Sequence, residues 1–240
     1  MRGRQMRGEF FGTGAPKICV PVMGRKPTEL RQSIMQAAAK EPGLIEWRAD
    51  RLEEPSFIGG CSAFFPELAP DIFTIFTFRT VEEGGCGRTA YYGSACSAAI
   101  ESGMFDAIDL EMHRDRSMIL ERAEHAHEKG MGVIASWHDF SCTPENDELL
   151  ENVRLGTELG GDVIKIAVMP EDERDVERLR EFALAAFKEA GRPLIIIGMG
   201  DAGRITRTDP AAFKSCVTFA SAGASSAPGQ IDIDELRRYL

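Results

Sequence analysis

The sequence lacks the cysteine patterns and the basic excess that mark several large classes of protein. Its six cysteines are scattered, and none forms a C-x-x-C pair. This spacing argues against a zinc site, a dithiol redox centre or a disulfide framework, so we expect free thiols in a reducing compartment. The formal net charge of −10 argues against a nucleic-acid or anionic-membrane partner, but it does not exclude a locally basic pocket.

Long apolar runs and flexible linkers are absent too. No run approaches the roughly 20 apolar residues of a membrane-spanning helix. Residues 1–16 lack the apolar core of a secretory signal, and we expect them to form a disordered or loosely attached extension. Because no stretch rich in proline, glycine or serine divides the remainder, we expect residues 17–240 to form one domain of a cytoplasmic protein.

What the chain does contain is an alternation of apolar runs and helical segments. Most runs are nearly continuous in Val, Ile and Phe, as in parallel strands buried on both faces. They span residues 17–23, 44–50, 71–79, 105–112, 132–140, 162–169, 193–199 and 216–222. Eight such runs at roughly 30-residue intervals predict an α/β fold, a single-domain (β/α)8 TIM barrel. A doubly wound sheet is the alternative, but GRKPTEL after the first run is not its usual phosphate loop.

Local signals place several helix ends. We expect Thr28 to cap the helix after the first strand. A later helix places Ile119, Ala123 and Ala126 on one face and is followed by Gly130, a position that favours glycine. The connection 53–70 has the weakest helical signal.

Polar side chains gather where the predicted strands end. In a barrel of parallel strands these ends share one face, where catalytic residues are usually found. Each candidate also has a structural interpretation, such as an ion pair inside the barrel between Glu46 and Arg48. The candidates in chain order are Glu46, Arg48, Arg79, Asp109, Glu111, His138, Asp139, Lys165, Arg204, Arg207, Ser226 and Gln230.

Lys165 stands apart because it lies inside the apolar run DVIKIAVMP. An unpaired ammonium there would cost several kcal/mol or lose its charge. One interpretation is a structural cation that pairs with a carboxylate from another strand. The other is an amine that burial and neighbouring cations keep uncharged, ready to form a Schiff base with a ketone or aldehyde. Such chemistry needs a base, and His138 is expected at the equivalent height on the preceding strand.

Eight short motifs that contain these residues resemble those of the type I 3-dehydroquinate dehydratase (3-dehydroquinase) family. In the family's order, from about Lys17 to the end of the chain, they are VPVMG, EWRAD, FTFRTVEEGG, IDLE, SWHDF, KIAVMP, MGDAGRITR and SAPGQ. The resemblance implies a (β/α)8 barrel that dehydrates 3-dehydroquinate to 3-dehydroshikimate in the shikimate pathway. It implies a lysine Schiff base, no metal and no cofactor. Because the family is often dimeric, it also suggests a homodimer, although the sequence carries no interface signature.

The resemblance also implies roles at matching positions. Lys165 would form the imine, His138 would act as general base and acid, and Glu83 would orient the imidazole; the family motif alone selects Glu83 over its neighbours. The substrate-binding residues would be Glu46, Arg48 and Arg79 at the ring hydroxyls, Arg207 at the carboxylate, and Ser226 and Gln230. Two departures are Thr206, where the family usually has serine, and a short segment after Gln230.

Two other functions fit parts of the pattern. A class I aldolase would share the lysine and could bind a phosphorylated substrate through GMGDAG and SAGASSAPG, but it need not place a histidine opposite the lysine. A non-catalytic barrel used as a sensor or scaffold would usually have lost the lysine, the histidine, the glutamate or the carboxylate-binding arginine. The dehydratase interpretation uses all four.

Overall fold

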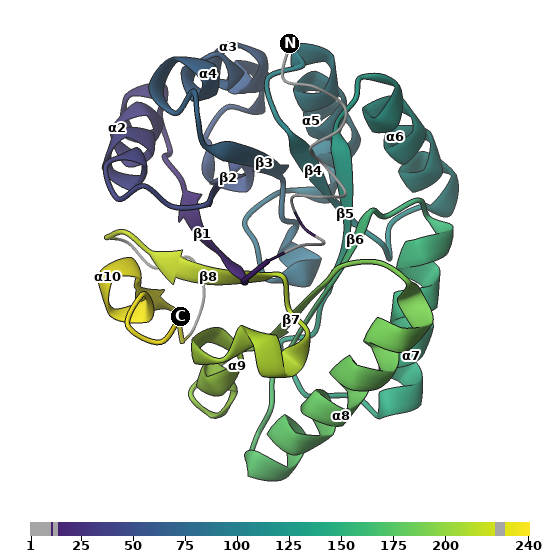
Figure 1. Cartoon of the computed structure of the whole chain (residues 1–240). Coiled ribbons are helices and arrows are strands. Elements are labelled where there is room, and N and C mark those ends of the chain that lie inside the picture. The colour runs from purple at the N-terminus through teal and green to yellow at the C-terminus, as the bar shows by residue number, and fades with distance from the viewer. Residues whose placement is uncertain (1–10, 12–13, 224–228) are drawn as a thin grey trace.

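The strands of the protein form a barrel surrounded by helices (Figure 1). The computed structural model describes residues 11, 14–223 and 229–240. Within this part of the chain the strands are β1 (Lys17–Val22), β2 (Leu44–Arg48), β3 (Phe73–Thr77), β4 (Ala107–Glu111), β5 (Gly132–His138), β6 (Val163–Val168), β7 (Leu194–Gly198), β8 (Val217–Ser221) and β9 (Ile231–Asp232). The first eight match the predicted strands, whereas the short β9 was not predicted.

Parallel pairing runs from β1 through β7 in chain order, and β8 returns to pair with β1. Between β7 and β8 the barrel closes through a single bridge, Leu194 to Ser215. There the backbone N–H of Cys216 donates to the Leu194 carbonyl at 2.8 Å, and that of Ile196 donates to the Ser215 hydroxyl at 3.1 Å. The seam is therefore held by fewer backbone bonds than the other strand pairs. In the sheet order β8 lies between β1 and β9, and β9 pairs with it in parallel over two residues.

Helices cover the outside of the barrel, as Figure 1 shows. Those within the described residues are α2 (Pro27–Ala38), α3 (Ile58–Ser62), α4 (Phe64–Leu68), α5 (Thr89–Ser102), α6 (Arg116–Glu128), α7 (Asn146–Glu158), α8 (Glu173–Ala190), α9 (Ile205–Thr208) and α10 (Ile233–Leu236). Short 3-10 turns lie at η1 (Ala49–Arg51), η2 (Pro55–Phe57), η3 (Val81–Glu83), η4 (Ala202–Arg204) and η5 (Pro210–Phe213). No helix in this part of the chain is long and apolar enough to cross a membrane.

The helix ends follow local chemistry with one correction. Ile119, Ala123 and Ala126 are buried on α6, and Gly130 adopts a φ of 75° just after its end, as predicted. Thr28 does not cap α2, because Pro27 occupies the first turn and the cap position falls on Lys26. A proline suits that place since its fixed φ matches the helix and its missing N–H would have no partner there.

The barrel interior changes from apolar to charged along the strands. At the amino ends, the interior layer consists of small and branched side chains, which include Cys19, Leu44, Ile75, Ala107, Ile134, Val163, Ile195 and Val217. Phe11, in the segment predicted to be a loose extension, is only 6% exposed and meets Phe73 edge-on at 5.2 Å. Because side chains alternate in a strand, positions two residues further on point inward as well, and three of these, Glu46, Asp109 and Lys165, are charged.

Candidate active site

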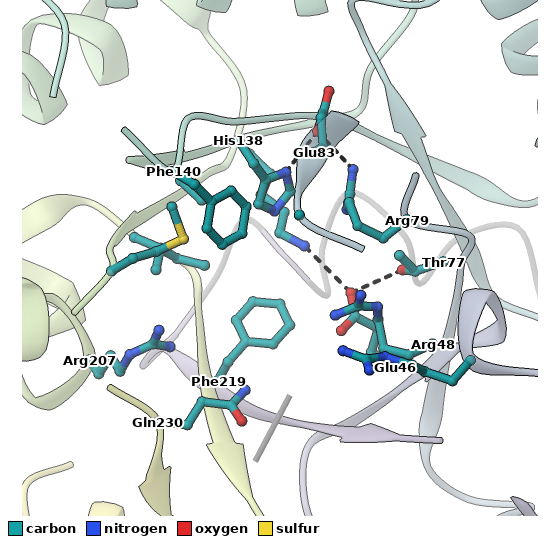
Figure 2. A pocket seen from close by; sticks show the side chains of 16 residues that line it. Glu46, Arg48, Thr77, Arg79, Glu83, His138, Phe140, Arg207, Phe219 and Gln230 are labelled. Carbon is teal, nitrogen blue, oxygen red and sulfur yellow. Dashed lines mark hydrogen bonds and ion pairs between the residues drawn. The ribbon is translucent and has the colours of Figure 1, made fainter. Parts of the chain in front are cut away.

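A pocket of about 320 Å³ opens at the carboxyl ends of the strands (Figure 2). It brings together eight of the nine residues that the sequence put forward as catalytic or substrate-binding: Glu46, Arg48, Arg79, Glu83, His138, Lys165, Arg207 and Gln230. The ninth, Ser226, lies outside the described residues. Two strand-end candidates have partners elsewhere, since Asp139 accepts hydrogen bonds from Ser141 and Arg204 pairs with Glu235.

Lys165 is buried and ion-paired. Its Nζ lies 3.1 Å from Oδ2 of Asp109 and 3.4 Å from Oε1 of Glu46, and it sits over the Phe219 ring, 4.8 Å from the centroid. Of the two interpretations of this amine, one placed cations beside it and the other paired it with a carboxylate from another strand. The charged groups in contact with it are carboxylates from β2 and β4, as the second predicted. They compensate a charge that would be costly to bury alone.

Asp109 links the amine to a second cation. Its Oδ1 accepts a hydrogen bond from Nη2 of Arg79 at 2.7 Å and another from the Ser136 hydroxyl at 2.5 Å. Burial by itself would raise the pKa of Asp109, but Arg79 and Lys165 outweigh it and lower the pKa to about 2. Asp109 is therefore a fixed negative charge between two cations.

His138 and Glu83 form a hydrogen-bonded pair beside Arg79 (Figure 2). Oε2 of Glu83 lies 2.9 Å from Nδ1 of His138 and 2.9 Å from Nη1 of Arg79. Burial, with Arg79, Lys165 and Arg48, holds the pKa of His138 well below its usual range, so the ring is neutral. If Nδ1 carries the hydrogen and donates it to Glu83, Nε2 is available as a base.

The height of His138 differs from the expectation. In the β5–β6 register Ser136 pairs with Lys165, and His138 pairs with Ala167, two residues further along the strand. Both side chains still face the interior because two residues restore the same face. The imidazole thus enters the pocket nearer the mouth than the amine does.

Glu83 has both acidic and basic neighbours. Burial raises its pKa to about 8, Arg79 opposes that shift, and Glu111 and Asp109 reinforce it. Glu111 is itself held by Arg79, by the backbone and hydroxyl of Thr80 at 2.7 Å each, and by Nε of Arg114 at 3.1 Å. The result is a buried network in which several carboxylates share few guanidinium groups.

Arg48 is fixed by a carboxylate that the sequence reasoning did not single out. Its Nε and Nη2 donate to the two oxygens of Asp50 at 2.8 and 3.0 Å. Asp50 also accepts a hydrogen bond from the backbone N–H of Cys86 at 3.1 Å, so it ties the end of β2 to the loop that carries Glu83. The final residue of the EWRAD motif was the available signal. Thr77 was missed as well, and its hydroxyl donates to Glu46 at 2.9 Å.

The opposite wall comes from β7, β8 and α9. In Figure 2 Arg207 and Gln230 lie across the pocket from Arg79 and Glu83. Burial lowers the pKa of Arg207 to about 10, which still leaves it charged at neutral pH. Thr206 anchors this segment, because its hydroxyl accepts a hydrogen bond from the Gly198 N–H at 3.0 Å and donates one to the Gly203 carbonyl at 2.8 Å. The threonine that replaces the family's usual serine therefore still holds the segment next to Arg207 against β7.

Known proteins resemble this chain over nearly its whole length. The model of the type I 3-dehydroquinase family matches residues 18–240. The 3-dehydroquinate dehydratase of Bacillus licheniformis is 38% identical and covers 98% of this chain and 95% of its own. That of Syntrophotalea carbinolica is 37% identical and covers 98% and 96%.

Solved structures of 3-dehydroquinate dehydratases are similar to this chain as well. The 3-dehydroquinate dehydratase from Geobacillus kaustophilus superposes with a TM-score of 0.90 at 33% identity, over 95% of this chain and 91% of that one. The type I enzyme from Clostridium difficile, with covalently modified comenic acid, gives 0.89 at 36% identity, over 95% and 92%. As the resemblance of its motifs predicted, the chain belongs to the type I 3-dehydroquinase family.

Proposed function

We propose that the protein dehydrates 3-dehydroquinate to 3-dehydroshikimate through a Schiff base on Lys165. The observation that carries the proposal is the placement of a buried lysine amine and a neutral histidine hydrogen-bonded to Glu83 in one pocket, with a cation on the opposite wall. Family membership and the names of the relatives favour the same reaction.

Imine formation begins when Lys165 loses a proton and its nitrogen attacks the C3 carbonyl. The carbinolamine then loses water and leaves an iminium, which has a single N–H where the ammonium had three. The adduct can therefore keep only one of the hydrogen bonds to Asp109 and Glu46 seen here. The carboxylate that is released can accept a substrate hydroxyl, which is the role we assign to Glu46.

Elimination requires a base next to the iminium. In the proposal His138 takes a proton from C2 through Nε2, and the C–H electron pair moves to form the enamine. The enamine then expels the C1 hydroxyl, which leaves as water with the proton carried by His138. Hydrolysis of the conjugated iminium releases the product and restores Lys165. Glu83 would stabilise the imidazolium between these steps.

Substrate binding is divided between the two walls. We assign Arg207 to the C1 carboxylate, because a guanidinium can donate two parallel hydrogen bonds to it. Arg48, held by Asp50, and Gln230 would contact the substrate's polar groups. Arg79 has four acceptors of its own among Glu83, Asp109, Glu111 and Ser136, so we assign it to holding Asp109 and Glu83 in place. A homodimer and a cytoplasmic location stay predictions.

Borohydride trapping tests the proposal directly. The protein is incubated with 3-dehydroquinate and borohydride, its intact mass is measured, and the modified peptide is mapped. A reduced adduct on Lys165 that has lost one water beyond imine formation supports both the imine and the elimination. An adduct that keeps this water would mean that the imine forms without a working base. Absence of any adduct on folded protein would overturn the Schiff-base proposal, with a Lys165→Ala variant as the control for labelling elsewhere.

A further inference from the structure

Phe140 is an aromatic side chain at the mouth of the pocket that the proposed reaction does not use. It follows β5 by two residues and is 39% exposed, an unusual place for a large apolar ring. Its ring lies nearly parallel to the imidazole of His138, with an interplanar angle of 17° and centroids 6.4 Å apart. Figure 2 shows it alongside His138, on the side away from Arg79.

The same ring packs on the loop that carries Glu83. Gly84, the next residue, has a φ of 75°, and a Cβ added to it would lie 2.3 Å from Cε2 and 2.4 Å from Cζ of Phe140. Real Cβ contacts are not this short, so the ring covers the Gly84 backbone in a way that any side chain there would prevent. Glycine also tolerates the left-handed backbone at this position. Phe140 therefore touches both segments that supply the His138–Glu83 pair.

We propose that Phe140 is a positioning residue that holds His138 against Glu83 and screens the imidazole from water. The groups facing His138 are Glu83, at hydrogen-bond distance from Nδ1, and the cations Arg79, Lys165 and Arg48. Bulk water admitted at the mouth would solvate the imidazolium and weaken the effect of those cations. The inference rests on the proposed roles of His138 and Glu83.

Replacing the ring should alter catalysis more than binding. Phe140→Ala is expected to lower kcat by roughly 10- to 100-fold, as misplacement of a catalytic group does, while KM changes much less. Because hydration raises the pKa of His138, the acid limb of kcat/KM should move upward by about one pH unit, a part of the several units that full burial can produce. Phe140→Leu keeps apolar cover and should fall between Phe140→Ala and the unmodified protein.

A second variant displaces the ring without changing it. Gly84→Ala puts a Cβ where the ring lies and should reproduce the loss of kcat and the shift in pH. Its matched control is Gly103→Ala, because Gly103 has a φ of 62° and open space around its Cβ position, so that it reports backbone strain alone. Phe57→Ala controls for loss of an exposed phenylalanine, since Phe57 is 49% exposed at the end of η2. Thermal unfolding of each variant shows which are folded.

Two readouts separate this inference from the proposed function. The pKa of His138 is measured by NMR titration of the ring in the free protein, which needs no turnover, and borohydride trapping reports the chemistry of Lys165. A raised His138 pKa in Phe140→Ala and Gly84→Ala, with a Lys165 adduct still formed, supports the inference. An unchanged His138 pKa, an effect on KM alone, or equal losses in Gly84→Ala and Gly103→Ala would overturn it. Absence of a Lys165 adduct in the unmodified protein would overturn the proposed function instead.

Discussion

The two walls of the pocket are built on different principles. The wall from β2 to β6 holds its charged side chains in mutual contact, with Arg79 alone reaching Glu83, Asp109 and Glu111. The wall from β7 and β8 is largely apolar, with Ile197, Met199 and Phe219 beside the Arg207 cation. The first wall has fixed its charges before any substrate arrives, and the second presents a desolvated cation. The comparison suggests that one wall serves chemistry and the other anion binding.

Removing the amine should give the largest effect on activity. Lys165→Ala is expected to lower kcat by roughly 10⁴-fold or more, as loss of a nucleophile does in other covalent mechanisms. The variant should still fold, because Asp109 retains its bond to Arg79. Enzyme assay by absorbance of the conjugated product, with circular dichroism for the fold, checks both. Turnover within tenfold of the unmodified protein would place the chemistry outside this wall.

Arg79→Met should damage stability more than any single change on the opposite wall. It leaves Glu83, Asp109 and Glu111 without their shared cation, and breaking a buried ion pair costs roughly 3–5 kcal/mol. Arg79 holds the pKa of Asp109 down, and its loss raises that pKa, so the cost should grow as pH rises. Urea unfolding at pH 5 and pH 8 measures it. A cost below about 1 kcal/mol at both values would mean that the network is not preorganised by Arg79.

Arg207→Met should affect substrate binding more than stability, the reverse of Arg79→Met. Methionine keeps much of the volume, and burial already disfavours the charge of Arg207, so the free energy of unfolding should fall by less than it does in Arg79→Met. KM should rise by roughly 30-fold or more, since a charge-assisted contact with a carboxylate is lost. Steady-state kinetics and urea unfolding test this together. If both arginine variants lost stability equally, the distinction between the walls would fail.

Glu83→Gln should produce the smallest effect, a change in how steeply the free energy of unfolding depends on pH. A carboxyl whose pKa is raised to about 8 on folding contributes stability below its ordinary pKa of 4.5, and that contribution is lost as pH rises toward 8. The difference in unfolding free energy between Glu83→Gln and the unmodified protein should therefore change between pH 5 and pH 8, with the variant gaining relative stability at the higher value. A difference that is constant over this range would show that Glu83 is ionised throughout.

The sequence predicted the features that are encoded within a single strand. Continuous apolar runs located all eight barrel strands. A single charged residue inside one of these runs marked Lys165 as a candidate. Its partners Asp109 and Glu46 could not be read in the same way, because they lie 56 and 119 positions away and meet it only across the barrel. The height of His138 depended on the β5–β6 register, which no local pattern encodes.

Features that join two loops were the hardest to predict. Asp50 looked like the end of a motif, and its importance came from a hydrogen bond to a loop 36 positions later. The contact of Phe140 with Gly84 needed the folded backbone of both segments. Thr28 failed as a cap for a simpler reason, since the proline before it already begins the helix.

The seam between β7 and β8 has a consequence for how the barrel opens. Local unfolding starts where the backbone ladder is thinnest, so amide hydrogens of β7 that face β8 should exchange with solvent sooner than those between β5 and β6. Arg207 lies in the segment between β7 and β8, whereas Lys165 belongs to β6. Under the proposed function, a substrate bound to Lys165 and held by Arg207 would connect β6 to this segment, so amide exchange at the seam should slow when the substrate is bound.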